Sequence, residues 1–350
     1  ASRSNAFRHC VFTSQSGVNV SANTPGIGNY LEYCVAYSPN GTVISANPGV
    51  VSNISGCIIA GSVGILAMPD SGSRNLFFTT NSIQSACETL SDLQRNYTNW
   101  AGNAYADPKF FNADASDFHL LSAAGFVSNG VWVTNSAVGY SPAIDFGRIG
   151  DQAYTNEPAP NGSRVNIGRY GGTEEATKSR SDPWLFAMTF NDGGSLIQTG
   201  RLEWAGGNLG GATVNLQFST NNGVVWSNIA TGVTAANESY VWAPTNAQPT
   251  VLWRVVDPVS GVAATNAKPF SIRPATNTAF VFYVNDSSTN GDLYCSAVGN
   301  NANSGIASNV PKRSLQAILD AYALRGGDTV YVDAGDYTTN FTTAIRAFDS

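Results

Sequence analysis

Acidic and basic side chains carry most acid–base catalysis, and the first 105 residues hold few of them. Catalysis on a polysaccharide needs two or three converging carboxylates, or calcium-binding carboxylates beside a basic residue that abstracts a proton. The charged residues of this stretch are Arg3, Arg8, Glu32, Asp70, Arg74, Glu88, Asp92 and Arg95. No two of the carboxylates lie at the regular spacing described below, so we expect no catalytic site here and do not expect an enzyme.

One loop has the composition of a calcium site. Residues 285–292, Asn-Asp-Ser-Ser-Thr-Asn-Gly-Asp, place oxygen-bearing side chains at alternate positions, and Asp286 and Asp292 are the candidate ligands. The loop lacks the bidentate glutamate of an EF-hand, which favours a solvated turn. We therefore expect no cofactor, with calcium as the alternative.

The two histidines, His9 and His119, lie too far apart in the sequence for their spacing to indicate a site. His119 lies among the motif aspartates Asp107, Asp117 and Asp145, whose carboxylates we expect to accept backbone N–H groups in turns. The sequence has no Walker loop, dinucleotide fingerprint, metal-spaced Cys/His set or nucleophile elbow. We expect structural roles for His119 and the motif aspartates.

Three cysteines reveal a repeat. Cys10, Cys34 and Cys57 lie 24 and 23 residues apart, each within a short β-prone run that a Gly/Asn/Ser/Pro-rich stretch follows. This step fits one rung of a solenoid, in which equivalent side chains stack in a ladder. Cys87 becomes a fourth member if residues 69–73 bulge out as a loop. We expect buried free thiols rather than disulfide bridges.

The composition narrows the class of protein. Of the 350 residues, 12% are charged and 43% hydrophobic, and the 35 glycines suit a β-rich chain with many tight turns. The net charge of −6 argues against nucleic acid as a partner. No apolar run approaches 18 residues and the opening residues are polar, so we expect neither a membrane span nor a signal peptide here. The lysine-poor composition suggests an extracellular or cell-surface protein.

Four motifs resemble a known family. They are Ala106–Phe111, Ser116–Leu120, Ser141–Gly147 and Val165–Thr173. Their succession resembles the segment that caps the C-terminal end of right-handed parallel β-helix proteins of the bacterial pectate-lyase-like superfamily. The resemblance implies an all-β fold in which residues 1–180 form β-helix rungs and their C-terminal cap.

Residues 181–273 predict a second unit. Seven runs have strand character: Trp184–Phe190, Arg201–Trp204, Thr213–Ser219, Val224–Ile229, Tyr240–Ala243, Val251–Val256 and Phe270–Ile272. Asn222-Gly223 indicates a hairpin, and the surrounding residues resemble a hairpin of secreted bacterial modules. We expect an immunoglobulin-like or fibronectin-like β-sandwich with Trp226, Trp242 and Trp253 in its core. An exposed tryptophan that stacks on sugar is the alternative for these residues.

Residues 274–350 start again. Leu315, Ile318, Leu319 and Tyr322 share one helix face after the N-cap Ser314, and residues 328–337 alternate as a strand does. The segment resembles the N-terminal cap and first rung of another β-helix of the same superfamily. The chain therefore predicts the end of one solenoid, a sandwich and the start of another.

Open solenoid ends need cover, because they present unpaired backbone groups and cut apolar core. We expect other copies of the chain, or adjoining β-helix repeats, to join head-to-tail in a surface layer or filament. The self-association candidates are Phe7, Cys10, Phe12, Phe341, Ile345 and Phe348. The alternatives are an adhesin, or a polysaccharide-binding or polysaccharide-degrading protein whose active rungs lie outside this segment.

Overall fold

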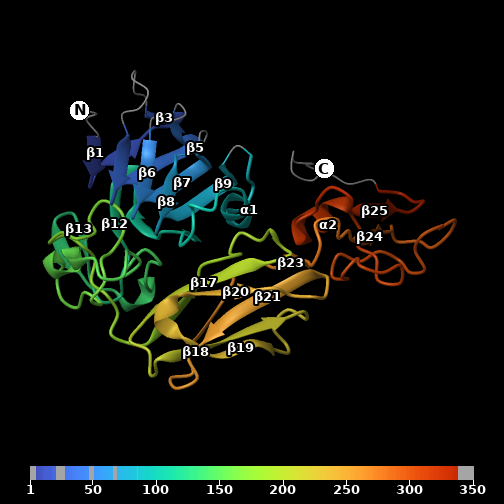
Figure 1. The fold of residues 1–350 in the computed structure, drawn as a ribbon. Helices are drawn as coiled ribbons and strands as arrows, with labels where there is room; N and C mark the ends of the chain where they lie inside the picture. The colour runs from blue at the N-terminus through green and yellow to red at the C-terminus, as the bar shows by residue number, and fades with distance from the viewer. Residues whose placement is uncertain (1–4, 21–27, 47–50, 66–68, 85, 338–350) are drawn as a thin grey trace.

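The computed structural model describes residues 5–20, 28–46, 51–65, 69–84 and 86–337 (Figure 1). Phe341, Ile345 and Phe348 lie outside the described residues.

Two parallel sheets form the first part of the chain. The first sheet has the order β1 (Asn5–Arg8), β4 (Asn29–Glu32), β6 (Val51–Ser55) and β8 (Ser71–Ser73). The second has the order β2 (Val11–Thr13), β5 (Val35–Ala46), β7 (Ile58–Ile65), β9 (Leu76–Gln84) and β10 (Ala104–Tyr105), and β3 (Gly17–Val20) also pairs with β5. The chain passes from one sheet to the other in repeated coils, each of which pairs with the coil before it.

The bend between the sheets repeats with the coils. A residue with positive φ comes first: His9, Tyr33, Gly56, Arg74 and Gly102. The next residue is a cysteine or an asparagine: Cys10, Cys34, Cys57, Asn75 and Asn103. We call these five the corner ladder. The prediction that Cys87 is its fourth member is wrong, because β8 belongs to the first sheet and places Asn75 at this position.

The corner ladder lines an apolar core between the two sheets. Cys34, Cys57 and Cys87 are buried there, and all five cysteines are free thiols. Helix α1 (Leu90–Asn96) closes one end of this core with Leu90 and Leu93, next to the fully buried Trp100. Cys87 therefore lies next to this closing helix, where its backbone pairs with that of Gln84 in an isolated antiparallel β-bridge.

Residues 106–183 cover the outer face of the second sheet. The elements of this segment are β11 (Phe110–Asn112), β12 (Asp117–Leu120), β13 (Phe126–Ser128), β14 (Val131–Val133) and three short 3₁₀ helices. Phe118, Phe146 and Ile167 pack against Val35 and Ile58 on that face. The expected end cap of the solenoid thus lies on a face of the second sheet instead. The strands of this sheet are apolar on both faces, and the second apolar face needs cover.

Two antiparallel sheets follow. One has the order β15 (Trp184–Ala187), β17 (Gly200–Gly207) and β20 (Ser239–Trp242). The other has the order β16 (Ser195–Ile197), β23 (Phe270–Arg273), β21 (Gln248–Val256), β18 (Thr213–Ser219) and β19 (Ser227–Thr234), with β22 (Ala263–Thr265) on β21 and only β16 parallel to its neighbour. Apolar side chains of both sheets share one core, so this part is a β-sandwich.

The sequence identified seven of the nine sandwich strands and missed β16 and β22, each only three residues long. Strand β19 begins at Ser227 rather than Val224, since residues 220–226 form the loop of the predicted hairpin. Asn222 and Gly223 have positive φ within this loop, which is longer than the two-residue turn that Asn-Gly favours.

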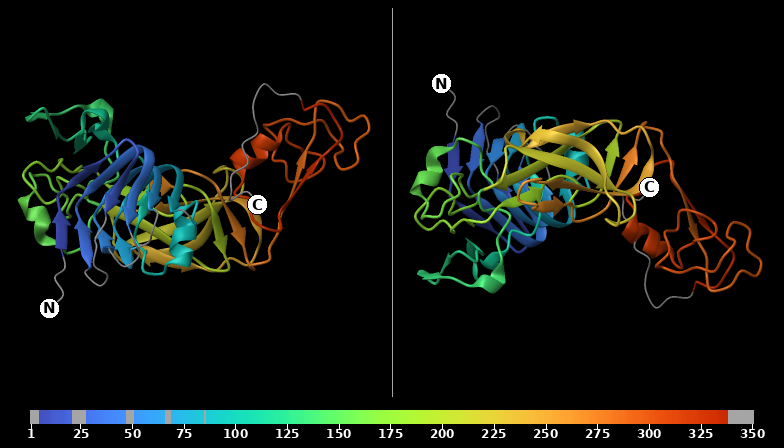
Figure 2. Two further views of the ribbon diagram at one scale, coloured as in Figure 1. Left: turned by 90° about the horizontal axis from the view of Figure 1, so that it is seen from above. Right: turned by 90° about the horizontal axis from the view of Figure 1, so that it is seen from below.

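The last described part is small. Strand β24 (Val281–Val284) pairs in parallel with β25 (Thr329–Val332), and helix α2 (Leu315–Ala321) packs Ile318 on Phe282. The Ser314 side chain caps the helix, as predicted. The parts form an elongated molecule with the parallel sheets at one end, the sandwich in the middle and this part at the other end (Figure 2). Among the described residues, no helix is long and apolar enough to cross a membrane.

Candidate functional site

The first coil lies at an edge of both parallel sheets. Strand β1 pairs only with β4, and β2 only with β5, within the part of the chain that the structure describes. Side chains of β1 are exposed along its whole length. Phe7 is 37% exposed and meets Phe12 edge-on, with 6.1 Å between the ring centroids. Cys10 and Phe12 are half-buried, so the three predicted residues of this end form one partly open apolar surface.

Charged and aromatic groups flank this surface. Arg8 Nε forms an ion pair with Glu32 Oε2 at 2.5 Å across the β1–β4 pair. His9 stacks on Tyr33 at 5.6 Å between centroids, and its Nδ1 lies 3.0 Å from Arg169 O. His9 thus connects the first coil to residues 106–183.

A second edge lies at the other end of the molecule. Strand β25 pairs with β24 alone among the described strands, and three of its four residues are exposed. Val332 is 43% exposed. Tyr331 stacks on Tyr294 with centroids 4.5 Å apart and lies 5.7 Å from Tyr283, its partner on β24. This edge therefore presents apolar and aromatic side chains beside backbone that pairs with no other described strand.

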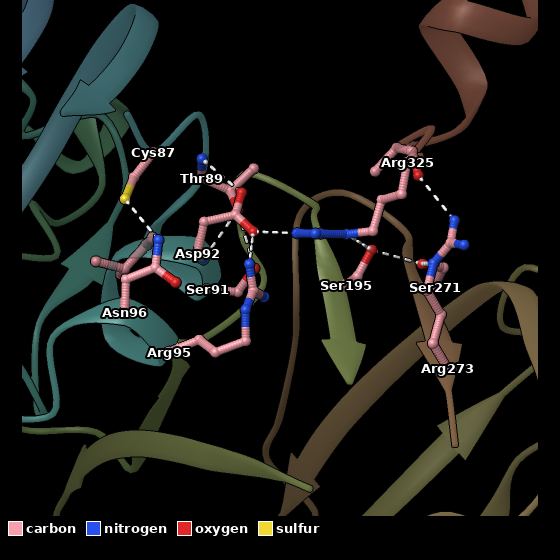
Figure 3. Close-up of polar contacts among 12 residues, drawn as sticks. Cys87, Thr89, Ser91, Asp92, Arg95, Asn96, Ser195, Ser271, Arg273 and Arg325 are labelled. Atoms are coloured by element: carbon pink, nitrogen blue, oxygen red, sulfur yellow. Dashed lines mark hydrogen bonds and ion pairs between the residues drawn. The ribbon is translucent and has the colours of Figure 1, made fainter. Parts of the chain in front are cut away.

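A polar joint connects the parallel sheets to the C-terminal part (Figure 3). Arg325 Nη2 forms an ion pair with Asp92 Oδ1. Asp92 also pairs with Arg95 Nη2 at 2.5 Å and completes a capping box with Thr89 at the start of α1. Burial would raise the pKa of Asp92, but Arg325 and Arg95 outweigh it and hold that pKa below its ordinary value.

The joint continues into the sandwich. Arg325 Nε donates to Ser195 Oγ at 3.2 Å, and Ser195 Oγ lies 2.8 Å from Ser271 Oγ. Arg273, which is 2% exposed, binds Asp328 with both terminal nitrogens at 2.8 and 2.7 Å. Strand β16 therefore contacts both α1 and Arg325, while β23 binds Asp328 through Arg273.

A second buried ion group fastens the sandwich to the first part. Glu238 accepts from Arg74 and from Arg164, whose Nη1 lies 2.5 Å from Oε1. Glu203, also buried, accepts from the backbone N–H of Gly102 at 3.0 Å and from Gln94 at 3.1 Å. Sequence reasoning missed both groups, because their members lie far apart along the chain.

The predicted calcium ligands are mostly engaged by the protein itself. Asp286 accepts from Ser288 N at 2.7 Å and from Asp336 N at 2.9 Å. Asp292 Oδ2 accepts from Asn285 at 2.6 Å, while its Oδ1 is buried without a partner. The described residues contain no group of three or more His, Cys, Asp or Glu side chains placed to hold a metal ion. Calcium binding stays a hypothesis.

The motif aspartates Asp107, Asp117 and Asp145 each accept hydrogen bonds from nearby groups of the protein. Asp107 accepts from Lys109 N at 2.8 Å. Asp117 accepts from His119 N at 3.1 Å and lies 2.6 Å from His119 Nδ1. His119 is buried and stacks on Tyr170 at 3.7 Å between centroids. Ser179 donates to Asp145 at 2.7 Å, and burial raises the pKa of Asp145 to about 6.

One cavity of about 290 Å³ lies between residues 106–183 and the first sandwich strand. Tyr140, Trp184 and Phe186 line it. The Arg180 guanidinium lies over the Tyr140 ring, 4.4 Å from its centroid. Aromatic rings and a cation at a cavity wall can contact the faces and hydroxyls of a sugar.

The predicted core tryptophans occupy two environments. Trp253 is fully buried in the sandwich, while Trp226 and Trp242 are half-buried. The Arg254 guanidinium lies 4.2 Å from the Trp226 ring centroid, beside the hairpin loop. Trp204, which the sequence analysis did not single out, is also fully buried.

The comparisons with known proteins give little to set beside this geometry. No family model matches the chain, and no curated protein matches it. Among solved structures, a Fn3-like protein from Clostridium thermocellum is similar at 22% sequence identity and a TM-score of 0.19, over 26% of this chain and 88% of that one. The β-sandwich is therefore defined by its own strand order and core.

Proposed function

We propose that this chain is an extracellular structural protein, a building block of a filament or surface layer whose copies join head-to-tail. In this proposal residues 1–180 hold the last rungs of a right-handed parallel β-helix and the segment that covers one of its sheets, residues 181–273 are an immunoglobulin-like sandwich, and residues 274–350 begin another β-helix. One observation supports the proposal: among the residues that the structure describes, β1 and β25 are exposed edge strands of parallel sheets at opposite ends of the molecule.

Edge strands favour this kind of joint. An unpaired strand presents backbone N–H and C=O groups, and an added strand satisfies them while it buries the side chains beside them. Strand β25 contains no proline and no charged residue, and β1 contains no proline and a single charged residue, Arg8, which is ion-paired with Glu32. The contact joins two different surfaces and does not close on itself, so its repetition builds a fibre.

The ion pairs between the parts support a building block of fixed shape. Asp92, Arg325 and Glu238 join elements of the first part, the sandwich and the C-terminal part. Buried, hydrogen-bonded ion pairs hold their elements in one geometry, since separation would leave buried charges unpaired. A fixed angle between the two edges gives a fibre of regular pitch.

Sedimentation velocity and electron microscopy over a range of protein concentrations test the proposal. We expect concentration-dependent growth of linear assemblies by the wild type. Phe7→Lys and Val332→Lys each place a charge on one edge and should stop growth, while Val224→Lys, a change in an exposed hairpin loop, should leave it unchanged. Dispersed monomers of the wild type at high concentration would contradict the proposal.

Polysaccharide binding is the second candidate function, and the cavity beside Tyr140, Trp184 and Arg180 favours it. The test is affinity electrophoresis of the wild type in gels that contain neutral and acidic polysaccharides. Retardation that Tyr140→Ala removes and Val224→Ala keeps would support it. Equal mobility in every gel would exclude this function for the cavity.

A further inference from the structure

The corner ladder joins each coil to the coil before it through the same backbone position. Cys34 Sγ donates to Phe7 O at 3.3 Å and Cys57 Sγ to Leu31 O at 3.5 Å. In the next two coils, Asn75 Nδ2 donates to Ile54 O at 2.9 Å and Asn103 Nδ2 to Gly72 O at 3.0 Å. Thiols and amides therefore perform one role in four consecutive coils.

The four acceptors are themselves register partners. Phe7 lies opposite Leu31, Leu31 opposite Ile54 and Ile54 opposite Gly72 in the first sheet. Each acceptor lies three residues before the ladder residue of its own coil. A ladder side chain therefore donates to a carbonyl of the preceding coil. The residue with that carbonyl lies opposite the residue three positions before the ladder residue.

The C-terminal part shows the same kind of contact. Val284 O accepts from Cys295 Sγ at 3.6 Å and from Asp333 N at 3.0 Å, so this carbonyl points toward β25. Val284 lies opposite Val332 on β25. Residues that lie opposite each other on neighbouring parallel strands direct their carbonyls the same way. Val284 O points toward β25, so Val332 O points away from β24.

We propose that the β25 strand of a second copy docks in parallel on β1 with Val332 opposite Phe7, and that Cys10 Sγ donates to its carbonyl oxygen. This inference rests on the proposed head-to-tail assembly and specifies its register. Cys10 is the outermost member of the corner ladder, and its Sγ donates to Arg8 O at 3.2 Å, as Cys34 Sγ also does to Glu32 O in its own coil.

Side chains agree with this register. Val330 and Val332 lie opposite the buried Phe282 and Val284, so both face the core side, as Phe7 does opposite the buried Leu31. The register brings two partly exposed apolar side chains together, Phe7 at 37% and Val332 at 43%.

The neighbouring pair of residues also agrees in size. Tyr331 lies opposite Ala6, the smallest side chain of β1. A shift by one residue would turn the valines outward, away from the core.

Disulfide trapping between copies reads the register directly. Ala6→Cys protein is mixed with Tyr331→Cys protein under mild oxidation, and Ala6→Cys is mixed separately with Thr329→Cys, which lies two residues away on the same face. We expect covalent dimers from the first mixture and at least about tenfold fewer from the second, since a disulfide needs Cα atoms about 4.4–6.8 Å apart. Mass spectrometry identifies the linked peptides and separates them from links to native cysteines.

Cys10 variants test the hydrogen bond. Cys10→Asn keeps a donor of the type found at Asn75 and Asn103, and should assemble at wild-type concentrations or lower. Cys10→Ala should need about three- to tenfold more protein, the effect of one hydrogen bond. If wild type assembles while trapping favours Thr329→Cys or Cys10→Ala is neutral, this register is wrong and the proposed function stands. If no variant and no wild type associates, both fail.

Discussion

Arg325 and Asp92 form an ion pair although 233 positions separate them in the chain. Asp92 lies in the first turn of α1, which closes the core of the parallel sheets, and Arg325 follows α2 in the C-terminal part. The same arginine contacts Ser195 of the sandwich at 3.2 Å. One side chain therefore touches all three parts, which makes this pair a direct determinant of their relative orientation.

Asp92→Asn should loosen the joint. The variant removes the charge that pairs with Arg325 and Arg95, and we expect the free energy of unfolding to fall by about 1–3 kcal/mol. The folded pKa of Asp92 is depressed, so its contribution is present above the unfolded pKa and is lost as pH falls through the folded value. Urea denaturation at neutral and acidic pH measures this, with the exposed Asp70→Asn as control. An equal loss in both variants would contradict the assignment.

Glu238→Gln should be more damaging. The buried Glu238 holds both Arg74 and Arg164, and its neutralisation leaves two arginines without their anion. Removal of one partner from a buried ion group costs about 3–5 kcal/mol. Thermal and urea unfolding should show this loss, whereas the exposed Glu175→Gln should stay within about 0.5 kcal/mol of wild type.

Glu157 should make stability fall as pH rises. Its Oε1 accepts from Asn166 N at 2.8 Å and Gly172 N at 2.7 Å, its Oε2 is buried without a partner, and burial raises its pKa to about 8. The folded state therefore binds the proton more tightly, and stability decreases by up to about 1.4 kcal/mol per unit between the unfolded and folded pKa values. Melting temperatures measured from pH 5 to pH 8.5 should depend less on pH in Glu157→Gln than in the wild type. An unchanged slope would contradict this prediction.

The corner ladder should accept a thiol for an amide, but not a methyl group. Asn75→Ala removes the bonds to Ile54 O and to Cys57 N and should cost about 1–3 kcal/mol, because both backbone groups are buried. Asn75→Cys should cost less, since Cys34 and Cys57 perform the same role. Urea unfolding of the two variants compares them. Equal losses would mean that the ladder acts by packing alone.

Local patterns predicted many of the elements correctly. Ser314 caps α2, Asn222-Gly223 lies in the loop of a hairpin, and the steps between Cys10, Cys34 and Cys57 match the register of the parallel strands. These features depend on backbone conformation and on neighbours a few residues or one coil away. Residue type and spacing are sufficient to indicate them.

Long-range packing decided the rest. The sequence suggested Cys87 as the next ladder member, but the short strand β8 brings Asn75 to that position. The spacing of cysteines could not indicate this, because an amide makes the same hydrogen bonds there as a thiol. Glu238 gave no signal beside Arg74 and Arg164, since ion pairs across distant segments follow no spacing rule. The chain by itself determined which strands form and how the coils repeat. Only the tertiary structure decided which charges meet in the joints and which of the described strands lie at a sheet edge, because both depend on how the finished parts pack together.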